Sequence, residues 1–245
     1  MVIAFATTAD GRDLVATVSG VLARPDVAGL HRDLLKALAE QPAALFVDVS
    51  DLTVADPVAL NVFRAVAQQA ARWPGTPLLI CAPPPAVRLI LDGPAFRLLR
   101  VHAGLDAARA GLAAGRTAEV RSISDDLLPV SGAARHARDL ATDACGRWDL
   151  PHLAGPAALI LTEMVGNVID HAGTMMTVHL TLVPRYLLLA VRDGSPVEVR
   201  RPVGGGRGLL LIEATAHAWG CVPSAGGKVV WASLRVSSPG AARGR

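Results

Sequence analysis

The spacing of apolar residues along the first 115 residues changes back and forth between two periods. Short or alternating apolar runs predict strands, and leucines three and four residues apart predict amphipathic helices. Strands and helices therefore follow one another, which is typical of a layered α/β fold. The predicted strands are residues 2–8, 13–20, 44–49, 78–82 and 96–101, and the predicted helices are residues 24–40, 56–72, a short one from 84, and 105–114.

A second series of elements follows a break at residues 113–117. It consists of a strand, two helices, a hairpin, a glycine-rich loop, a helix and a second hairpin. The expected strands are 118–123, 174–183, 185–192, 219–223 and 228–236, and the expected helices are 130–148, 157–172 and 207–218. We therefore predict two α/β domains, residues 1–115 and 118–237, and a tail at 238–245.

The predicted helix from Ala157 to Ala172 is almost wholly apolar but carries three polar residues. Glu163, Asn167 and His171 stand at i, i+4 and i+8, which places them on one face of a regular helix. A helix this apolar is expected inside a domain core. Unpaired buried polar groups cost about 1–3 kcal/mol each, so these side chains require either protein partners or a ligand.

Composition and charge narrow the possible functions. A hydrophobic content of 51% and a charged content of 18% exclude a disordered chain. No apolar run reaches the roughly 18 residues of a membrane span, and the N-terminus lacks the pattern of a signal peptide. The net charge of +3 comes with scattered arginines and no lysine-rich tail, so nucleic-acid binding is not expected. Three distant cysteines form neither a disulfide framework nor a metal motif, which favours a cytoplasmic location.

Two further motifs carry residues suited to nucleotide chemistry. Asp193-Gly194 ends an apolar strand, and the glycine-rich run at 204–208 leads into a helix. Glycines let backbone N–H groups approach phosphates, and a helix N-terminus adds a favourable dipole. Glu163 and Asn167 offer oxygen ligands for Mg²⁺, and Asp193 could accept a hydrogen bond from an amine such as that of adenine. Each motif alone has an ordinary explanation as a turn, a loop or a satisfied polar cluster; together, in this order, they indicate a nucleotide site.

Residues 119–236 resemble the ATP-binding domain of the GHKL superfamily, an α/β sandwich of the Bergerat type found in gyrase, histidine kinases and MutL. Within it, the anti-sigma-factor serine kinases of actinobacteria are most similar. Residues 163–171 match the N box of these kinases, 191–194 the first glycine box, 206–209 the second, and 218–220 with 227–231 the closing strands.

The resemblance implies an ATP-dependent serine/threonine protein kinase that uses Mg²⁺. Glu163 would be the general base, Asn167 would hold Mg²⁺, and Asp193 would bind the adenine amine. The other residues that the resemblance assigns to the nucleotide are His171, Gly194, Gly206, Arg207, Gly208 and Lys228. The γ-phosphate would pass to a STAS-type antagonist in partner-switching control of transcription. A sigma factor and a second copy of the chain are further possible partners, whereas direct binding to nucleic acid or membrane is not expected.

The first half resembles a STAS domain, the fold of anti-sigma-factor antagonists, over residues 46–60. Asp48, Ser50, Leu52, Asp56 and Leu60 fit the family pattern. Pro57 and Val58 replace its two serines, and Ala59 replaces the following glycine. The second serine is the phosphoacceptor of the family, so Val58 implies a STAS domain that is not phosphorylated there.

One alternative is a non-catalytic module in which the STAS half docks a regulator. Nucleotide would then be a structural ligand or would not bind. The segment between Asp193 and Gly206 is short for an ATP lid, which favours this alternative. A sensor histidine kinase is not expected, because His136 lies within the first helix of the second domain rather than on a dimerising helix pair.

Overall fold

The computed structural model describes residues 3–115, 120–197 and 207–236 of the 245-residue chain. The chain forms two compact units, Met1–Thr117 and Ala118–Arg245. The predicted tail at 238–245 lies outside the described residues.

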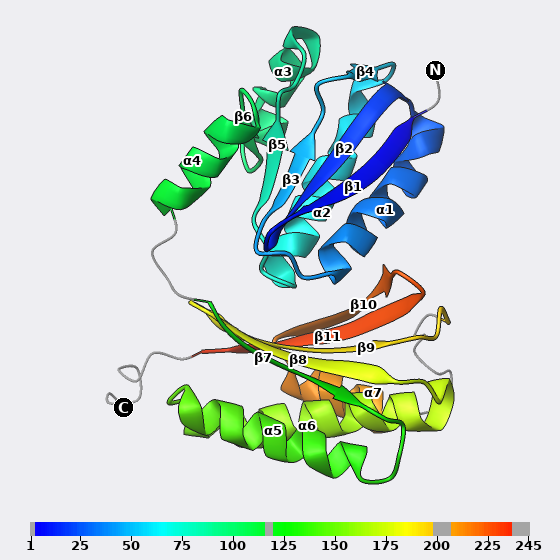
Figure 1. Cartoon of the computed structure of the whole chain (residues 1–245), viewed down its shortest axis with the longest axis vertical. Helices are drawn as coiled ribbons and strands as arrows, with labels where there is room; N and C mark the ends of the chain where they lie inside the picture. The colour runs from blue at the N-terminus through cyan, green and yellow to red at the C-terminus, as the bar shows by residue number, and fades with distance from the viewer. Residues whose placement is uncertain (1–2, 116–119, 198–206, 237–245) are drawn as a thin grey trace. The chain divides into compact units, whose positions relative to one another are not determined.

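Unit 1 contains a six-stranded mixed sheet in the order β1-β2-β3-β5-β6, with β4 pairing to β2 (Figure 1). β1 and β2 form an antiparallel hairpin, and the other pairs are parallel. The strands are β1 (Ala4–Asp10), β2 (Asp13–Leu22), β3 (Leu45–Asp48), β4 (Leu52–Val54), β5 (Leu78–Cys81) and β6 (Arg100–His102). The helices are α1 (Val27–Ala39), α2 (Asn61–Arg72), α3 (Pro85–Leu91) and α4 (Leu105–Gly115).

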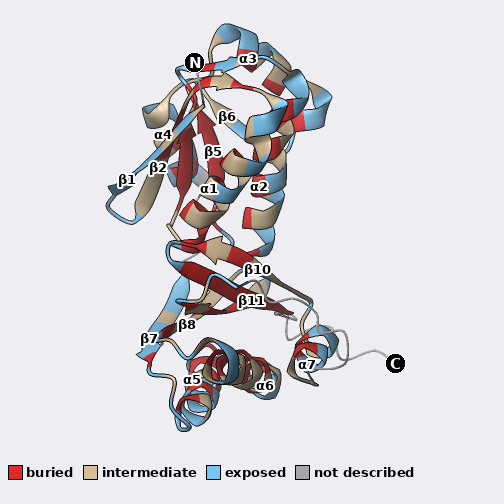
Figure 2. Cartoon of the chain, turned by 90° about the vertical axis from the view of Figure 1, so that its right-hand side faces the viewer, coloured by how far each residue is buried: buried red, intermediate tan, exposed pale blue. Residues whose placement is uncertain are grey.

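The central strands of this sheet are buried on both faces (Figure 2). Val47 and Ile80 pack in one core cluster with α1 and α2, whereas Phe46 and Leu79 pack in another with α4. Successive residues of a strand point to opposite faces, so these near-continuous apolar runs require helices on both sides. Unit 1 therefore has the layered α/β architecture expected from its sequence.

Two details of unit 1 differ from the expected elements. The strand expected at 96–101 begins only at Arg100, as β6, because the preceding residues form turns: Phe96 ends the 3₁₀ turn Pro94–Phe96, and the Leu99 N–H donates to the Phe96 carbonyl at 2.8 Å. The helix expected from Pro57 begins as the 3₁₀ turn Pro57–Leu60 before α2. Its predicted cap is confirmed: the Asp56 carboxylate accepts a hydrogen bond from the Val58 N–H at 2.9 Å.

Unit 2 contains an antiparallel five-stranded sheet in the order β10-β11-β9-β8-β7. Helices α5, α6 and α7 cover one face of this sheet (Figures 1 and 2). The strands are β7 (Arg121–Leu127), β8 (Met176–Val183), β9 (Tyr186–Asp193), β10 (Ala218–Ser224) and β11 (Gly227–Arg235). The helices are α5 (Ala133–Arg147), α6 (Pro151–Asn167) and α7 (Arg207–Thr215).

β7 begins three residues later and ends four residues later than the strand expected at 118–123. β7 is the edge strand of the sheet, where polar side chains reach solvent. On the helix-facing side, the Asp125 carboxylate lies 2.7 Å from Nε2 of His136 on α5. His136 therefore links α5 to the edge strand.

α6 lies at the centre of the core of unit 2. Its residues Ile160, Leu161 and Val165 are fully buried and pack against the helix-facing side chains of the strands. The neighbouring α5 faces α6 with alanines four residues apart, and these small side chains allow close packing of the two helices. Burial of each large aliphatic side chain stabilises the fold by about 1.5–3 kcal/mol, so this packing holds α6 in place.

Residues Pro151–Ala172 are long and apolar enough, by length and composition alone, to cross a membrane, contrary to the count of apolar residues made above. The core helix of a globular unit passes the same test, and α6 is such a helix. Its apolar surface is used inside unit 2.

Candidate functional site

The three polar residues predicted for one regular helix lie on two different elements. Glu163 and Asn167 are half-buried and one turn apart, but α6 ends at Asn167. The next five residues, Val168–Ala172, form a π turn closed by a 2.8 Å hydrogen bond from the Gly173 N–H to the Val168 carbonyl. His171 therefore lies in this π turn and not on the α-helix that carries the other two residues. His171 is exposed.

The carboxylate of Glu163 lies beside the first turn of α7. A Cβ atom placed on Gly208 would stand 2.5 Å from Glu163 Oε2, so only glycine fits here without displacing the carboxylate. The fold thus brings Gly208 beside Glu163, which is 45 residues earlier in the chain. Gly206 and the side chain of Arg207 lie outside the described part of the structure, so their expected contacts with phosphate remain predictions.

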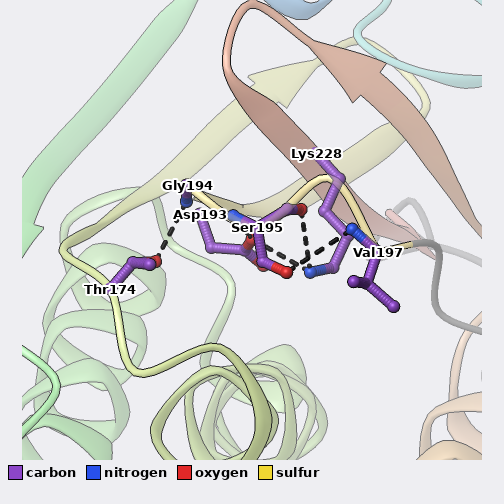
Figure 3. A network of polar contacts seen from close by, with 6 residues as sticks. All are labelled: Thr174, Asp193, Gly194, Ser195, Val197 and Lys228. Carbon is purple, nitrogen blue, oxygen red and sulfur yellow. Dashed lines mark hydrogen bonds and ion pairs between the residues drawn. The ribbon is translucent and has the colours of Figure 1, made fainter.

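Asp193 and Lys228 form a buried ion pair at the end of β9 and the start of β11 (Figure 3). The two residues are direct partners in the antiparallel register, and Lys228 Nζ lies 2.9 Å from Asp193 Oδ1. Only 1% of the Asp193 side chain and 10% of the Lys228 side chain are exposed. Asp193 stands two residues after the core residue Val191, and Lys228 stands two residues before the core residue Val230, so the pair lies on the helix-facing side of the sheet.

One oxygen of the Asp193 carboxylate accepts two hydrogen bonds, and the other accepts none within the described residues. Oδ1 also accepts the Ser195 N–H at 2.8 Å, as in an Asx turn. Oδ2 is buried and has no hydrogen-bond partner within the described ranges. An unpaired buried acceptor costs about 1–3 kcal/mol, and a ligand N–H would remove that cost. This orphaned oxygen fits the amine of an adenine base.

Three residues that the sequence did not single out hold this carboxylate in place. Thr174 Oγ1 accepts the Gly194 N–H at 3.0 Å and ties the end of β9 to the segment after the π turn (Figure 3). The Ser195 N–H donates to Asp193 Oδ1. A residue two positions after an aspartate is the usual donor of an Asx turn, so this spacing could have indicated Ser195 from the sequence. A Cβ on Gly227 would stand 1.9 Å from the Asp193 carbonyl oxygen, so glycine is required there for the strands to pair. The sequence placed Gly227 at a turn and at the start of a closing strand but did not indicate this close approach.

The predicted Mg²⁺ role of Asn167 depends on a ligand. Mg²⁺ is usually held by one or two protein groups together with phosphates and water. Within the described residues, no group of three or more His, Cys, Asp or Glu side chains could hold a metal ion alone. Asn167 and Glu163 thus fit a cation that arrives with phosphates, and neither has a hydrogen-bond partner among the described side chains.

Comparison with known proteins yields matches among solved structures only. No family model matches the chain, and no curated protein matches it. An anti-sigma factor antagonist from Mycobacterium paratuberculosis is 19% identical over 46% of this chain and 95% of its own, with a TM-score of 0.40. SpoIIAA, an anti-sigma factor antagonist in its unphosphorylated form, is 14% identical over 47% of this chain and all of its own, with a TM-score of 0.37. A structure of the RsbU and RsbW domains of a Mycobacterium tuberculosis protein is 19% identical, with a TM-score of 0.40; the match covers 49% of this chain and 33% of that one.

Proposed function

We propose that this protein is an ATP-binding regulator of the partner-switching type, in which unit 2 phosphorylates a STAS-type antagonist. The observation that carries the proposal is the buried Asp193 carboxylate with its unpartnered Oδ2. It lies on the helix-facing side of the sheet, the same side as α6 with Glu163 and Asn167. The resemblance of residues 119–236 to GHKL kinases supports the same assignment.

The residues of unit 2 divide the chemistry between them. Asp193 Oδ2 accepts a hydrogen bond from the adenine amine, and Asn167 holds the Mg²⁺ that accompanies the phosphates. Bound Mg²⁺–ATP would supply the phosphoryl group. Glu163 orients the acceptor hydroxyl of the partner protein and takes its proton, since phosphoryl transfer depends mainly on positioning and charge neutralisation. Gly208 keeps the space that the Glu163 carboxylate occupies.

Unit 1 is proposed as a STAS domain that docks a partner without being phosphorylated at residue 58. Val58 is 56% exposed at the start of the 3₁₀ turn before α2, where the family carries its acceptor serine. The Asp56 carboxylate receives the Val58 N–H and also pairs with Arg24. These contacts lower the pKa of Asp56, the backbone hydrogen bond from Val58 contributing most. The turn is thus fixed by charge and hydrogen bonding, and it presents an apolar side chain. We place the protein in the cytoplasm, where a sigma factor could bind.

The alternative is a non-catalytic module in which nucleotide is a structural ligand or does not bind. Val58 at the acceptor position and the short segment after Asp193 favour it. Only the kinase requires transfer of the phosphoryl group, so measurements of transfer and of ATP binding together separate the two functions.

The decisive experiment incubates the full chain with labelled ATP, Mg²⁺ and isolated STAS proteins that carry an intact acceptor serine. Transfer of label to a STAS protein, lost in Glu163→Gln but with ATP affinity retained, is the expected result. Glu213→Gln is the matched control, because Glu213 is a glutamate of α7 outside the proposed site. ATP binding measured by calorimetry, weakened by Asp193→Asn, without any transfer would instead establish the non-catalytic alternative. No binding of ATP would refute the kinase and would leave the non-catalytic module without a nucleotide.

A further inference from the structure

We propose that Lys228 determines base specificity by donating a hydrogen bond to ring nitrogen N1 of adenine. This inference rests on the proposed nucleotide site and adds a second contact to the one assigned to Asp193. The ion pair of Asp193 and Lys228 makes some of its possible hydrogen bonds and leaves others unmade.

The ammonium of Lys228 has three N–H donors. Within the described residues it meets two acceptors, Asp193 Oδ1 at 2.9 Å and the Ser195 carbonyl oxygen at 3.3 Å (Figure 3). One donor is left, and the unpartnered Asp193 Oδ2 is the adjacent free acceptor. The pair therefore presents one acceptor and one donor side by side on the helix-facing side of the sheet.

The fold holds this pair in a fixed position. Asp193 and Lys228 are cross-strand neighbours, and Gly227 lets β11 approach the Asp193 carbonyl closely enough for the ion pair to form. Both side chains are nine-tenths buried or more, so water competes little for the remaining donor and acceptor. Burying two charges is costly unless their remaining hydrogen bonds are made, which favours a ligand that completes both.

Adenine supplies the complementary pattern. Its Watson–Crick edge carries the N6 amine, a donor, next to N1, an acceptor. With the amine on Asp193 Oδ2, N1 takes the free donor of Lys228. Guanine in the same orientation would place its O6 acceptor against the Asp193 oxygen and its N1–H against the ammonium. Two like pairs would then face one another, which a buried site strongly disfavours.

The experiment compares binding of ADP and 1-deaza-ADP, in which a C–H replaces N1, to the full-length protein by calorimetry. Wild-type protein is expected to bind 1-deaza-ADP at least tenfold more weakly, because a hydrogen bond to a charged donor is lost. Lys228→Met is expected to bind the two nucleotides equally. The chain has only one other lysine, and Lys36→Met is therefore the matched control and should discriminate like wild type.

The outcomes separate this inference from the function on which it rests. Equal binding of the two nucleotides by wild type overturns the role of Lys228 but leaves the nucleotide site intact, and this comparison needs no variant. Undiminished discrimination in a folded Lys228→Met protein also overturns it. If wild type binds neither nucleotide, the proposed function itself fails.

Discussion

We expect the substitution Gly208→Ala to lower the proposed phosphoryl transfer without lowering the free energy of unfolding. An added Cβ would lie 2.5 Å from Glu163 Oε2, whereas ordinary contact begins at 3.4 Å. The carboxylate must therefore withdraw by about 0.9 Å, which the flexible end of a glutamate side chain can do at little cost. Alanine also favours a helix over glycine by about 0.8–1 kcal/mol in a helix interior, and by less in the first turn of α7. We expect the free energy of unfolding to stay the same or rise slightly.

Catalysis should respond in the opposite direction. A displacement of about 1 Å in a group that positions a reactant can lower the rate about a hundredfold. Phosphoryl transfer to a STAS protein by Gly208→Ala should therefore fall about 10- to 100-fold, with ATP affinity little changed. The assays are single-turnover transfer from labelled ATP, calorimetric binding of ATP, and denaturant unfolding followed by circular dichroism.

Gly155→Ala is the matched control, because this glycine also lies in a helix and a Cβ there meets nothing within 4 Å. It should leave transfer unchanged. Equal transfer rates for Gly208→Ala and wild type would refute the assignment of Glu163 as the base. A large loss of stability in Gly208→Ala would refute the view that the carboxylate is free to withdraw.

Three further predictions concern stability and reactivity. Gly227→Ala places a Cβ 1.9 Å from the Asp193 carbonyl oxygen, which is a backbone atom. Unit 2 should therefore lose about 1–3 kcal/mol of unfolding free energy in denaturant titrations. An unchanged midpoint would show that β9 and β11 can separate to make room for the methyl group. The pKa of His179 is lowered, mainly by burial. Because the unfolded chain then binds a proton more readily, stability should fall as pH decreases below about 6.5, and His179→Gln should flatten that part of the pH profile of the unfolding midpoint; an equal slope in both proteins would contradict this cause. Burial, with a smaller contribution from Asp48, raises the pKa of the Cys81 thiol to about 11. Iodoacetamide at pH 8 should therefore leave Cys81 unlabelled in the native protein and label it after unfolding, as measured by mass spectrometry. Rapid labelling of the native protein would show that the thiol is accessible.

Local sequence determined most of the helices and strands. The alternation of apolar residues and the Asp56-Pro57 cap act within a few residues of one another, so their effect can be read along the chain. Errors occurred where the environment changed the meaning of a residue. β7 continues through two aspartates to Leu127 at the sheet edge, and turns before Arg100 shorten the strand expected at 96–101.

The residue types of the candidate site could also be predicted from the sequence, but their arrangement in space could not. Glu163, Asn167 and Asp193 stand out because polar residues interrupt apolar segments that need partners. The apolar repeat predicted a regular helix through Ala172, whereas α6 ends at Asn167 and a π turn that carries His171 follows. Nothing in the local pattern signals such a turn, since it depends on how the helix end meets the following strand.

Tertiary structure alone decided which distant residues meet. The pairing of β9 with β11 sets Lys228 against Asp193, 35 residues apart, and leaves one carboxylate oxygen without a partner. The packing of α7 beside α6 sets Gly208 against Glu163. Such contacts depend on strand register and helix packing over the whole unit, and both are determined by the total burial of apolar surface rather than by any short segment. The sequence by itself therefore determined which residues the site needs, and the fold determined which of their hydrogen-bonding groups remain free for a ligand.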